Sequence, residues 1–343
     1  MSSYINTISL TEAPILLDVR DISVEFVSKQ KGAPAARAVD HVSFALRKGE
    51  MLGLVGESGC GKTTLMLSLM RLLPAAGRIV TGSIEFAGQD LLDLTESEMG
   101  EVRWRNISII FQGAMNALNP VRTVGDQIAE ALVRHGMAGN KSDAAGRVGD
   151  LLEMVGIGVN RANQYPHQYS GGMRQRAMIA MALACNPQVV VADEPTTALD
   201  VMIQAQILEL LDELRHKLGL SVILVTHDLG VVAEICDTVL VMYGGVTAEY
   251  ADVDTIFNQA QHPYTQQLLH AFPDLTRPTE RLISIPGAPP RLDNLPPGCR
   301  FAPRCPLVFD RCHREPPALH RLAEGHLASC HLLDRQSTVN SEQ

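Results

Sequence analysis

Short apolar runs alternate along the chain with segments of helical periodicity. The clearest runs are MLGLV (51–55), VVVA (189–192), SVILVT (221–226) and TVLVMY (238–243). Because these runs are apolar throughout instead of alternating with polar residues, they predict strands that are covered on both faces. Strands of this kind that are separated by helices indicate a mostly parallel sheet in an α/β domain.

One longer segment has the periodicity of an amphipathic helix. Apolar side chains recur there at Ile207, Leu211, Leu214 and Leu218. This spacing places them on one face of a helix. We therefore expect a helix that packs against the core, and we assign it no ligand.

Composition favours a soluble protein with a sizeable core. The chain has 343 residues, of which 46% are apolar, and its formal net charge is −9. Negative charge disfavours nucleic acid as a main partner. The N-terminal segment lacks the basic and apolar regions of a signal peptide. No stretch approaches the roughly 18 consecutive apolar residues of a membrane helix. We expect a soluble, cytoplasmic protein with no nucleic-acid partner.

The first apolar run leads into a glycine-rich loop, GESGCGKTT (56–64), in which Gly56, Gly61, Lys62 and Thr63 match the pattern G-x-x-x-x-G-K-[ST]. The backbone N–H groups of such a loop wrap a phosphate. Lys62 would reach the β- and γ-phosphates, and the Thr63 hydroxyl would ligate Mg²⁺. The other loop residues expected to contact the nucleotide are Ser58, Gly59, Cys60 and Thr64.

Cys60 carries a separate expectation. It lies near the start of the helix that follows the loop, where a thiolate is favoured. No histidine is close to it in sequence, so we do not expect a catalytic thiol. We expect instead that a maleimide alkylates Cys60 and blocks nucleotide binding.

Polar side chains follow two of the predicted strands. Asp193 and Glu194 come directly after VVVA, and His227 follows SVILVT. Ligands of open α/β sheets bind at the carboxyl ends of the strands. Asp193 can hold Mg²⁺ through water, Glu194 can polarise an attacking water, and His227 can sense the γ-phosphate. An acidic helix start would also explain the two carboxylates taken alone.

A second anion site is predicted at YSGGMRQRAMIAMALA (169–184). Ser170, Gly171 and Gly172 stand at the start of a helix, where N–H groups are unpaired. The alternative is a plain N-cap. Because the chain already has its own phosphate loop, this second site would have no ligand unless the ATP of another subunit docks on it.

The order of these motifs resembles that of ABC transporter ATPases. The matching segments are the phosphate loop (56–63), Gln112 after ISIIF, the SGG stretch (170–172), VVVADEP (189–195), TALD (197–200) and His227. The resemblance covers residues 16–260. It implies an α/β fold in which a RecA-like P-loop core carries an antiparallel β subdomain and an inserted α-helical subdomain at about 93–180. It also implies that two such units pair head to tail around ATP.

Family roles follow from the same resemblance. Glu194 would be the general base and His227 the switch. Gln112 would ligate Mg²⁺ beside Thr63 and Asp193. Asp200 would communicate across the dimer. Phe26, in LLDVRDISVEF (16–26), is the best candidate for stacking on adenine, and a simple core position is its alternative.

The C-terminal part resembles one branch of this family. QHPYTQQLL (261–269) and the later SIPGAPPRLDNLPPGCRFAPRCP are similar to ATPases of dipeptide/oligopeptide permeases. This similarity implies a second, related ATPase as dimer partner, two transmembrane permease subunits and an extracytoplasmic solute-binding protein. The chain would then lie peripherally at the cytoplasmic face of the inner membrane. Peptides, nickel, glutathione and oligosaccharides are substrates of this branch, and the sequence does not choose among them.

Two positions depart from the pattern of the branch. The usual Q-[DE]-P appears as Gln112-Gly113-Ala114, where a membrane subunit should dock. Tyr169 replaces the usual leucine before the SGG stretch. Neither position belongs to a phosphate-binding group, so we expect catalysis to survive.

The extension at 261–335 ends in a small cysteine-rich segment. Cys299, Cys305, Cys312 and Cys330 are spaced C-x5-C-x6-C-x17-C. Four thiolates suit a [4Fe–4S] cluster, which the branch resemblance also implies. Nearby arginines would offset its charge; they are Arg300, Arg304, Arg311 and Arg314. A structural zinc, which more often uses closer cysteine pairs, and free thiols are the alternatives.

Together these features predict an ATP-hydrolysing subunit that powers an importer of peptides or related small solutes, with ATP, Mg²⁺ and a [4Fe–4S] cluster as cofactors. Two alternatives come from other classes. One is a soluble ABC ATPase outside transport, and the other is a cluster-bearing regulatory protein that binds ATP without turnover.

Overall fold

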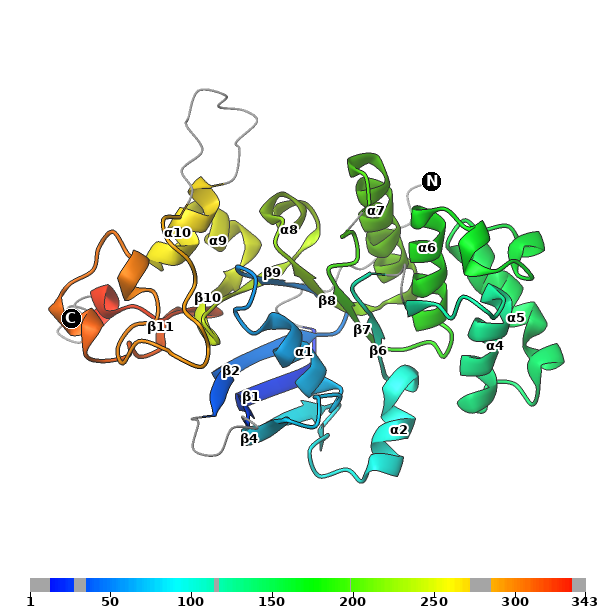
Figure 1. Ribbon diagram of the computed structural model, residues 1–343, viewed down its shortest axis with the longest axis horizontal. Helices are drawn as coiled ribbons and strands as arrows, with labels where there is room; N and C mark the ends of the chain where they lie inside the picture. Colours follow the sequence, from blue (N-terminus) through cyan, green and yellow to red (C-terminus); the bar gives the residue numbers. More distant parts are fainter. Residues whose placement is uncertain (1–12, 28–34, 114–116, 198, 272–284, 335–343) are drawn as a thin grey trace. The chain divides into compact units, whose positions relative to one another are not determined.

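The computed structural model describes residues 13–27, 35–113, 117–197, 199–271 and 285–334 (Figure 1). The chain divides into two compact units. Among the described residues, the first comprises 13–17, 46–51 and 93–225, and the second comprises 18–45, 52–92 and 226–334.

Parallel strands form the core of the first unit. β6 (Ile107–Ile110), β7 (Val189–Asp193) and β8 (Ser221–Thr226) lie side by side in that order. All three run parallel, with Ala192 next to Ile110 on one side and next to Leu224 on the other. Every residue of β7 and β8 is buried. The continuous apolar runs therefore predicted these two strands correctly.

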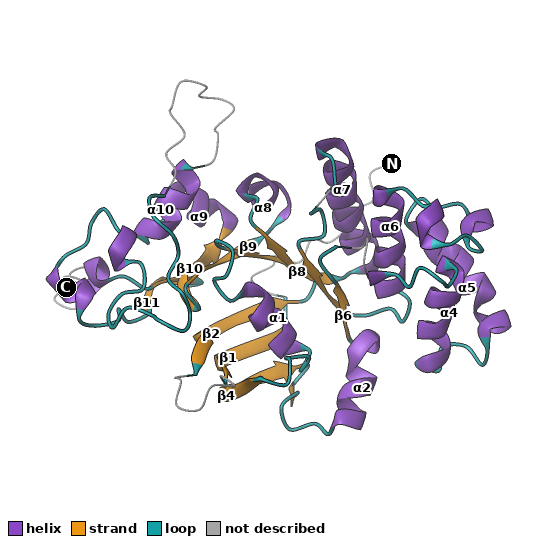
Figure 2. Cartoon of the chain, in the orientation of Figure 1, coloured by secondary structure: helices purple, strands orange, loops and turns teal. Residues whose placement is uncertain are grey.

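Helices complete the first unit (Figure 2). They are α2 (Glu96–Arg105), α4 (Val124–Arg134), α5 (Lys141–Met154), α6 (Gly171–Ala182) and α7 (Val201–Leu218), with the short 3₁₀ segments η2 (Val159–Arg161) and η3 (Pro166–Gln168). Helices α4, α5 and α6 pack against one another. They lie within or at the end of the stretch 93–180 where we expect the helical subdomain, whose boundaries stay a prediction.

Helix α7 carries the predicted apolar stripe. Ile207, Leu211 and Leu214 are buried, as expected. Leu218 is 41% exposed, so the expectation is wrong at this position. The helix ends there because Gly219 adopts a left-handed conformation with φ +64°.

The second unit contains the strand that leads into the phosphate loop. β3 (Met51–Val55) pairs in parallel with β9 (Thr238–Tyr243), which places Leu54 opposite Leu240. A turn at Gly244 and Gly245 reverses the chain into β10 (Val246–Asp252), which runs antiparallel to β9. Both glycines have positive φ values, +55° and +90°, which favour glycine over residues with a side chain.

The C-terminal extension adds strands to this sheet. β12 (His326–Ala328) pairs antiparallel with β10, and β11 (His320–Ala323) pairs antiparallel with β12. Glu249 of β10 lies opposite Ala328. The last third of the extension is therefore part of the fold of the second unit.

A second sheet has the strand order β2-β1-β4-β5. Its strands are β1 (Ile15–Phe26), β2 (Ala36–Arg47), β4 (Gly77–Phe86) and β5 (Gln89–Asp90). The last two form an antiparallel hairpin. The β4–β5 hairpin agrees with the expected antiparallel β subdomain, and the subdomain as a whole stays a prediction.

Short helices surround the strands of the second unit. They are α1 (Lys62–Leu69), α8 (Leu229–Ile235), α9 (Val253–Gln259), α10 (Pro263–His270) and the 3₁₀ segments η4 (Ala302–Arg304), η5 (Asp310–His313) and η6 (His331–Leu333). Helices α8 and α9 lie together, and α9 packs on β9 and β10 (Figure 1). Across the described ranges, none of the helices has the length and apolar character needed to cross a bilayer.

Candidate functional site

The phosphate loop occupies the connection between β3 and α1 in the second unit. Gly56 and Gly61 have φ values of +149° and +103°. A Cβ atom on Gly56 would lie 2.2 Å from the carbonyl oxygen of Met242, and one on Gly61 would lie 2.3 Å from that of Ala38. Backbone packs so closely on the loop that only glycine fits at either position.

Lys62 begins α1, and its side chain folds back over the loop. Its Nζ donates to the carbonyl oxygens of Gly56 at 2.7 Å and Glu57 at 3.0 Å. Only 6% of the residue is exposed. The ammonium is thus held at the loop that is expected to wrap the phosphates. Ser58, Gly59 and Thr63 are exposed on the same loop, and Thr64 is half-buried.

The environment of Cys60 differs from the one that the sequence predicted. It is 1% exposed, and burial raises the pKa of its thiol despite the Lys62 ammonium, whose Nζ lies 3.6 Å from Sγ. The expectation of a favoured thiolate at this helix start is therefore wrong. The physical reason is desolvation, which disfavours the charged form of a thiol more than the nearby positive charge favours it.

Phe26 and His227 also belong to the second unit. Phe26 ends β1, is half-buried, and packs its ring on Gly77, where a Cβ atom would come within 2.9 Å of it. Both the adenine-stacking role and the core position stay open for Phe26. His227 follows β8 and is exposed, so its side chain is accessible to a ligand.

The two carboxylates of the first unit have contrasting environments. Asp193 ends β7 and is 4% exposed. Glu194 has a positive φ of +43°. Its Oε2 accepts hydrogen bonds from Gln112 Nε2 at 2.7 Å and from Thr197 Oγ1 at 2.8 Å. The structure therefore brings Gln112 to the expected general base. It also adds Thr197, to which the sequence alone gave no role.

The SGG stretch starts α6 in the same unit. Ser170 caps the helix, since its Oγ accepts from the Met173 N–H at 3.3 Å, which confirms the N-cap alternative. A Cβ atom on Gly172 would meet Cγ2 of Ile203 at 2.7 Å, and one on Gly171 would meet Leu199 at 3.3 Å. The glycines thus allow α6 to approach the start of α7. The anion-binding role of this helix start stays a prediction.

Asp200 caps α7. Its Oδ1 accepts from the Ile203 N–H at 3.0 Å. This cap fixes the end of the TALD segment, in which Ala198 lies outside the described residues. Communication across a dimer stays a prediction for Asp200.

The two departures from the branch pattern have different outcomes. Tyr169 is 3% exposed, and its hydroxyl donates to the carbonyl oxygen of Arg161 at 3.0 Å. It is therefore a core residue of the first unit, which agrees with the expectation that it touches no phosphate group. In Gln112-Gly113-Ala114, the last residue lies outside the described residues. Gly113 has a positive φ of +75°, and a Cβ atom added there would have no contact within 4 Å among the described residues, apart from its chain neighbours.

The four clustered cysteines line one apolar pocket of the second unit, together with Phe301, Leu307 and Phe309. These cysteines are Cys299, Cys305, Cys312 and Cys330. Burial raises the pKa of the thiols of Cys299, Cys330 and Cys305, the last to about 11. Across the residues the structure describes, no three Cys, His, Asp or Glu side chains stand close enough to hold one metal ion.

Three of the arginines near these cysteines pair with carboxylates. Arg300 pairs with Asp40, Arg304 with Glu57, and Arg311 with Glu315 and Asp334. The expectation that these three arginines offset the charge of a cluster is wrong, because each guanidinium already pairs with at least one carboxylate.

Comparison with known proteins places this chain in a class. The family model "ABC transporter" matches residues 39–197. A dimeric ATP-binding cassette in a post-hydrolysis state, bound to ADP and Pi, superimposes with a TM-score of 0.61 at 26% identity, over 69% of this chain and 99% of that chain. CbiO1 of Clostridium perfringens, part of an ABC transporter complex, gives a TM-score of 0.62 at 25% identity, over 77% and 96%. The chain belongs to the ABC transporter ATPases.

Further similarity identifies the branch. The model "Oligopeptide/dipeptide transporter, C-terminal region" matches residues 248–312. The dipeptide transport ATP-binding protein DppD of Escherichia coli K12 is 48% identical over 92% of this chain and 96% of the relative. The oligopeptide transport ATP-binding protein AppD of Bacillus subtilis 168 is 46% identical over 95% and 99%. The chain is an ATPase of the dipeptide/oligopeptide permease branch, as the sequence motifs predicted.

Proposed function

We propose that this chain binds and hydrolyses ATP to power the import of peptides or related small solutes. The observation that carries the proposal is the phosphate loop, where Lys62 is buried on the Gly56 and Glu57 carbonyl oxygens at the start of α1. The names of DppD and AppD support peptides as the substrate class. Neither alternative function explains the match of residues 248–312 to a permease-specific region.

ATP would be bound chiefly by the backbone of the phosphate loop. The N–H groups from Gly59 to Thr64 and the N-terminus of α1 supply positive potential for the phosphates. The Lys62 ammonium would leave its carbonyl partners for the β- and γ-phosphate oxygens. Mg²⁺ would be held by Thr63, Gln112 and Asp193, and Phe26 would stack on adenine.

Hydrolysis would depend on Glu194. A carboxylate beside the γ-phosphate can orient a water and accept its proton as the oxygen attacks phosphorus. Gln112 and Thr197 donate to this carboxylate, which restricts its rotation. His227 would report on the γ-phosphate. In a head-to-tail dimer, the ATP of the other subunit would dock on Ser170, Gly171 and Gly172. Asp200 would communicate across the dimer.

We propose four partners around this ATPase. They are a second, related ABC ATPase, two transmembrane permease subunits and an extracytoplasmic solute-binding protein. Supporting this proposal are the branch-specific extension and the transport names of the relatives. The chain would then bind peripherally at the cytoplasmic face of the inner membrane.

We also propose that Cys299, Cys305, Cys312 and Cys330 hold a [4Fe–4S] cluster. The donor set fits this group, because four thiols line one apolar pocket. A bound cluster would supply a four-thiolate cross-link and a one-electron redox centre.

Substitution of Glu194 tests the ATPase proposal. Glu194→Gln keeps the shape of the side chain but removes the proton acceptor, so we expect ATP to bind normally while turnover falls at least about a hundredfold. Glu209→Gln, on the exposed side of α7, is the matched control and should behave like the unchanged protein. Retained turnover in Glu194→Gln would refute the role of this residue as general base.

Anaerobic purification with metal and sulfide analysis tests the cluster. We expect close to four irons and four sulfides per chain, as a [4Fe–4S] cluster requires. The visible absorbance should disappear in Cys305→Ser and persist in Cys185→Ser, a buried cysteine that does not line the pocket. Stoichiometric zinc without sulfide would establish the zinc alternative in its place.

A further inference from the structure

Glu57, the second residue of the phosphate loop, is held by three separate parts of the second unit. Its carbonyl oxygen accepts from Lys62 at 3.0 Å. Its N–H donates to the hydroxyl of Tyr264 in α10 at 2.9 Å. Its carboxylate accepts two hydrogen bonds from Arg304 in the C-terminal extension. The loop is therefore tied to a segment that lies 247 positions further along the chain.

Arg304 contacts the Glu57 carboxylate in a bidentate geometry. Its Nη1 and Nη2 meet the two carboxylate oxygens of Glu57 at 2.5 and 2.9 Å. Nη1 also donates to the Tyr243 hydroxyl at 3.2 Å, and Nε donates to the Pro286 carbonyl oxygen at 2.8 Å. The side chain is only 4% exposed. A bidentate pair of this kind fixes both distance and direction.

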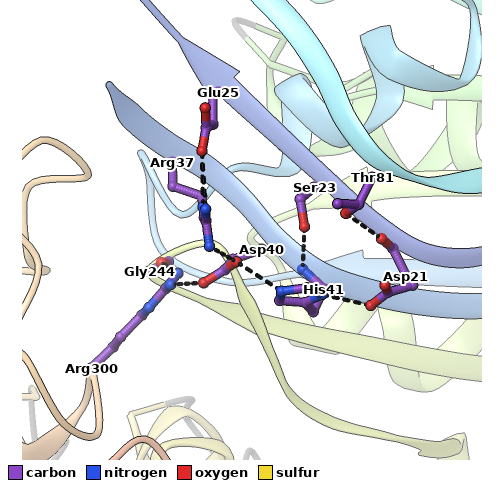
Figure 3. A network of polar contacts seen from close by, with 9 residues as sticks. All are labelled: Asp21, Ser23, Glu25, Arg37, Asp40, His41, Thr81, Gly244 and Arg300. Carbon is purple, nitrogen blue, oxygen red and sulfur yellow. Dashed lines mark hydrogen bonds and ion pairs between the residues drawn. The ribbon is translucent and has the colours of Figure 1, made fainter. Parts of the chain in front are cut away.

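A second connection runs through the neighbouring arginine. Arg300 donates to the carbonyl oxygen of Gly244 at 2.5 Å and pairs with Asp40 of β2 (Figure 3). The next residue, Gly245, donates its N–H to the carbonyl oxygen of Cys60 in the loop at 2.9 Å. The extension thus supports the phosphate loop directly through Arg304 and indirectly through Arg300.

We infer that Arg304 is a positioning residue for ATP binding, which acts through Glu57 to hold the phosphate loop in its binding conformation. This inference rests on the proposed function and adds to it, because neither the motifs nor the relatives' names assign a nucleotide role to the extension. Arg304 directly precedes Cys305, so the segment proposed to hold the cluster also supports the nucleotide loop.

Two physical effects follow from the loss of Arg304. The loop would lose a fixed point and would have to be ordered when ATP binds, which weakens affinity. The Glu57 carboxylate would also keep its negative charge without a partner, beside the place where phosphates bind. Both effects weaken binding before the chemical step. KM for ATP should therefore rise while kcat changes little.

Direct binding of MgATP to the full chain tests this inference. For Arg304→Ala we expect the Kd for MgATP and KM to rise about tenfold, with kcat within about twofold. Arg304→Lys, which keeps the charge without the paired geometry, should lie in between. Arg311→Ala is the matched control. It also adjoins a cysteine and pairs with two carboxylates, but it does not contact the loop.

A double substitution separates positioning from a general loss of folding. In Arg304→Ala/Glu57→Gln the unpaired charge is gone, so part of the lost affinity should return. Damage to the extension alone would leave the double variant as weak as Arg304→Ala, and that result would overturn the inference. So would an unchanged Kd in Arg304→Ala, or a lower kcat with unchanged KM. Absence of ATP binding to the unsubstituted protein would instead refute the proposed function.

Discussion

Glu194 combines an unfavourable backbone conformation with a fully engaged side chain. Its φ of +43° is rare for a residue with a Cβ atom and costs about 1–3 kcal/mol. Its N–H donates to the carbonyl oxygen of Val225 at 2.9 Å, and its carboxylate accepts from Gln112 and Thr197. Backbone strain that is held by such contacts is typical of functional positions.

Cys60 should react slowly with maleimides, which corrects the sequence-based expectation that a maleimide alkylates it and thereby blocks nucleotide binding. Burial raises the pKa of its thiol, so the nucleophilic thiolate is scarce near neutral pH, and the 1% exposure restricts access. We expect alkylation at pH 7.5 to be at least about tenfold slower in the folded protein than in urea. Pulse labelling followed by peptide mass spectrometry measures this ratio.

The pH dependence provides a second criterion for Cys60. Because the thiol has a raised pKa, its rate of alkylation should keep increasing to a higher pH than the rate of an ordinary thiol does. A small free thiol such as N-acetylcysteine, labelled under the same conditions, serves as the comparison. Rapid labelling of Cys60 at pH 7.5 would contradict the buried position.

Residue-scale predictions from sequence succeeded where one local pattern defines the geometry. The loop from Gly56 to Thr63 is such a pattern, because a short turn and a helix start are sufficient to place Lys62. Contacts between distant segments could not be predicted, because no local sequence pattern indicates them. The pair of Glu57 and Arg304 depends on tertiary packing, and so does the burial that raises the pKa of Cys60.

At the scale of elements, the approach to α6 is held in place by core packing. The Tyr169 ring is buried directly before the cap residue Ser170, and its hydroxyl donates to Arg161. Arg174 Nε donates to the carbonyl oxygens of Pro166 and Tyr169 at 2.8 and 3.2 Å. These contacts position the start of the helix that carries the SGG stretch.

Removal of the Tyr169 hydroxyl should destabilise the protein. Tyr169→Phe leaves the Arg161 carbonyl oxygen without this donor, so the free energy of unfolding should fall by about 1 kcal/mol. Tyr169→Leu, which restores the residue usual in the branch, should cost more because it also leaves a cavity. Urea unfolding measures both. Tyr165→Phe is the control, since Tyr165 is 41% exposed and should change stability little.

Sequence patterns predicted the elements unevenly. The apolar runs gave β3, β7, β8 and β9, because a fully buried strand needs a continuous apolar run. β11 and β12 were missed. They are short and partly polar, and they form only because β10 offers an edge on which β12 can pair. No local sequence pattern indicates that the edge of β10 is available for pairing.

At the scale of the whole molecule, the chain combines the ATPase motifs with the permease-specific extension, and this extension is part of the fold of the second unit. β12 pairs with β10, and Arg304 pairs with the phosphate loop. Binding of ATP should therefore stabilise the folded chain as a whole, because a ligand that binds only the native state adds its binding free energy to stability.

MgATP should raise the Tm of Glu194→Gln, in which hydrolysis does not consume the ligand. At about 100 times the Kd, linkage predicts about 2.7 kcal/mol of added stability, which corresponds to a rise of a few degrees. Lys62→Ala removes the ammonium that we propose to hold the phosphates, so in that background the rise should vanish. Lys141→Ala, which removes an exposed ion pair with Asp126, is the control and should retain it. Scanning calorimetry with and without nucleotide measures these shifts. An equal rise in the Lys62→Ala background would place the ATP-binding site elsewhere in the chain.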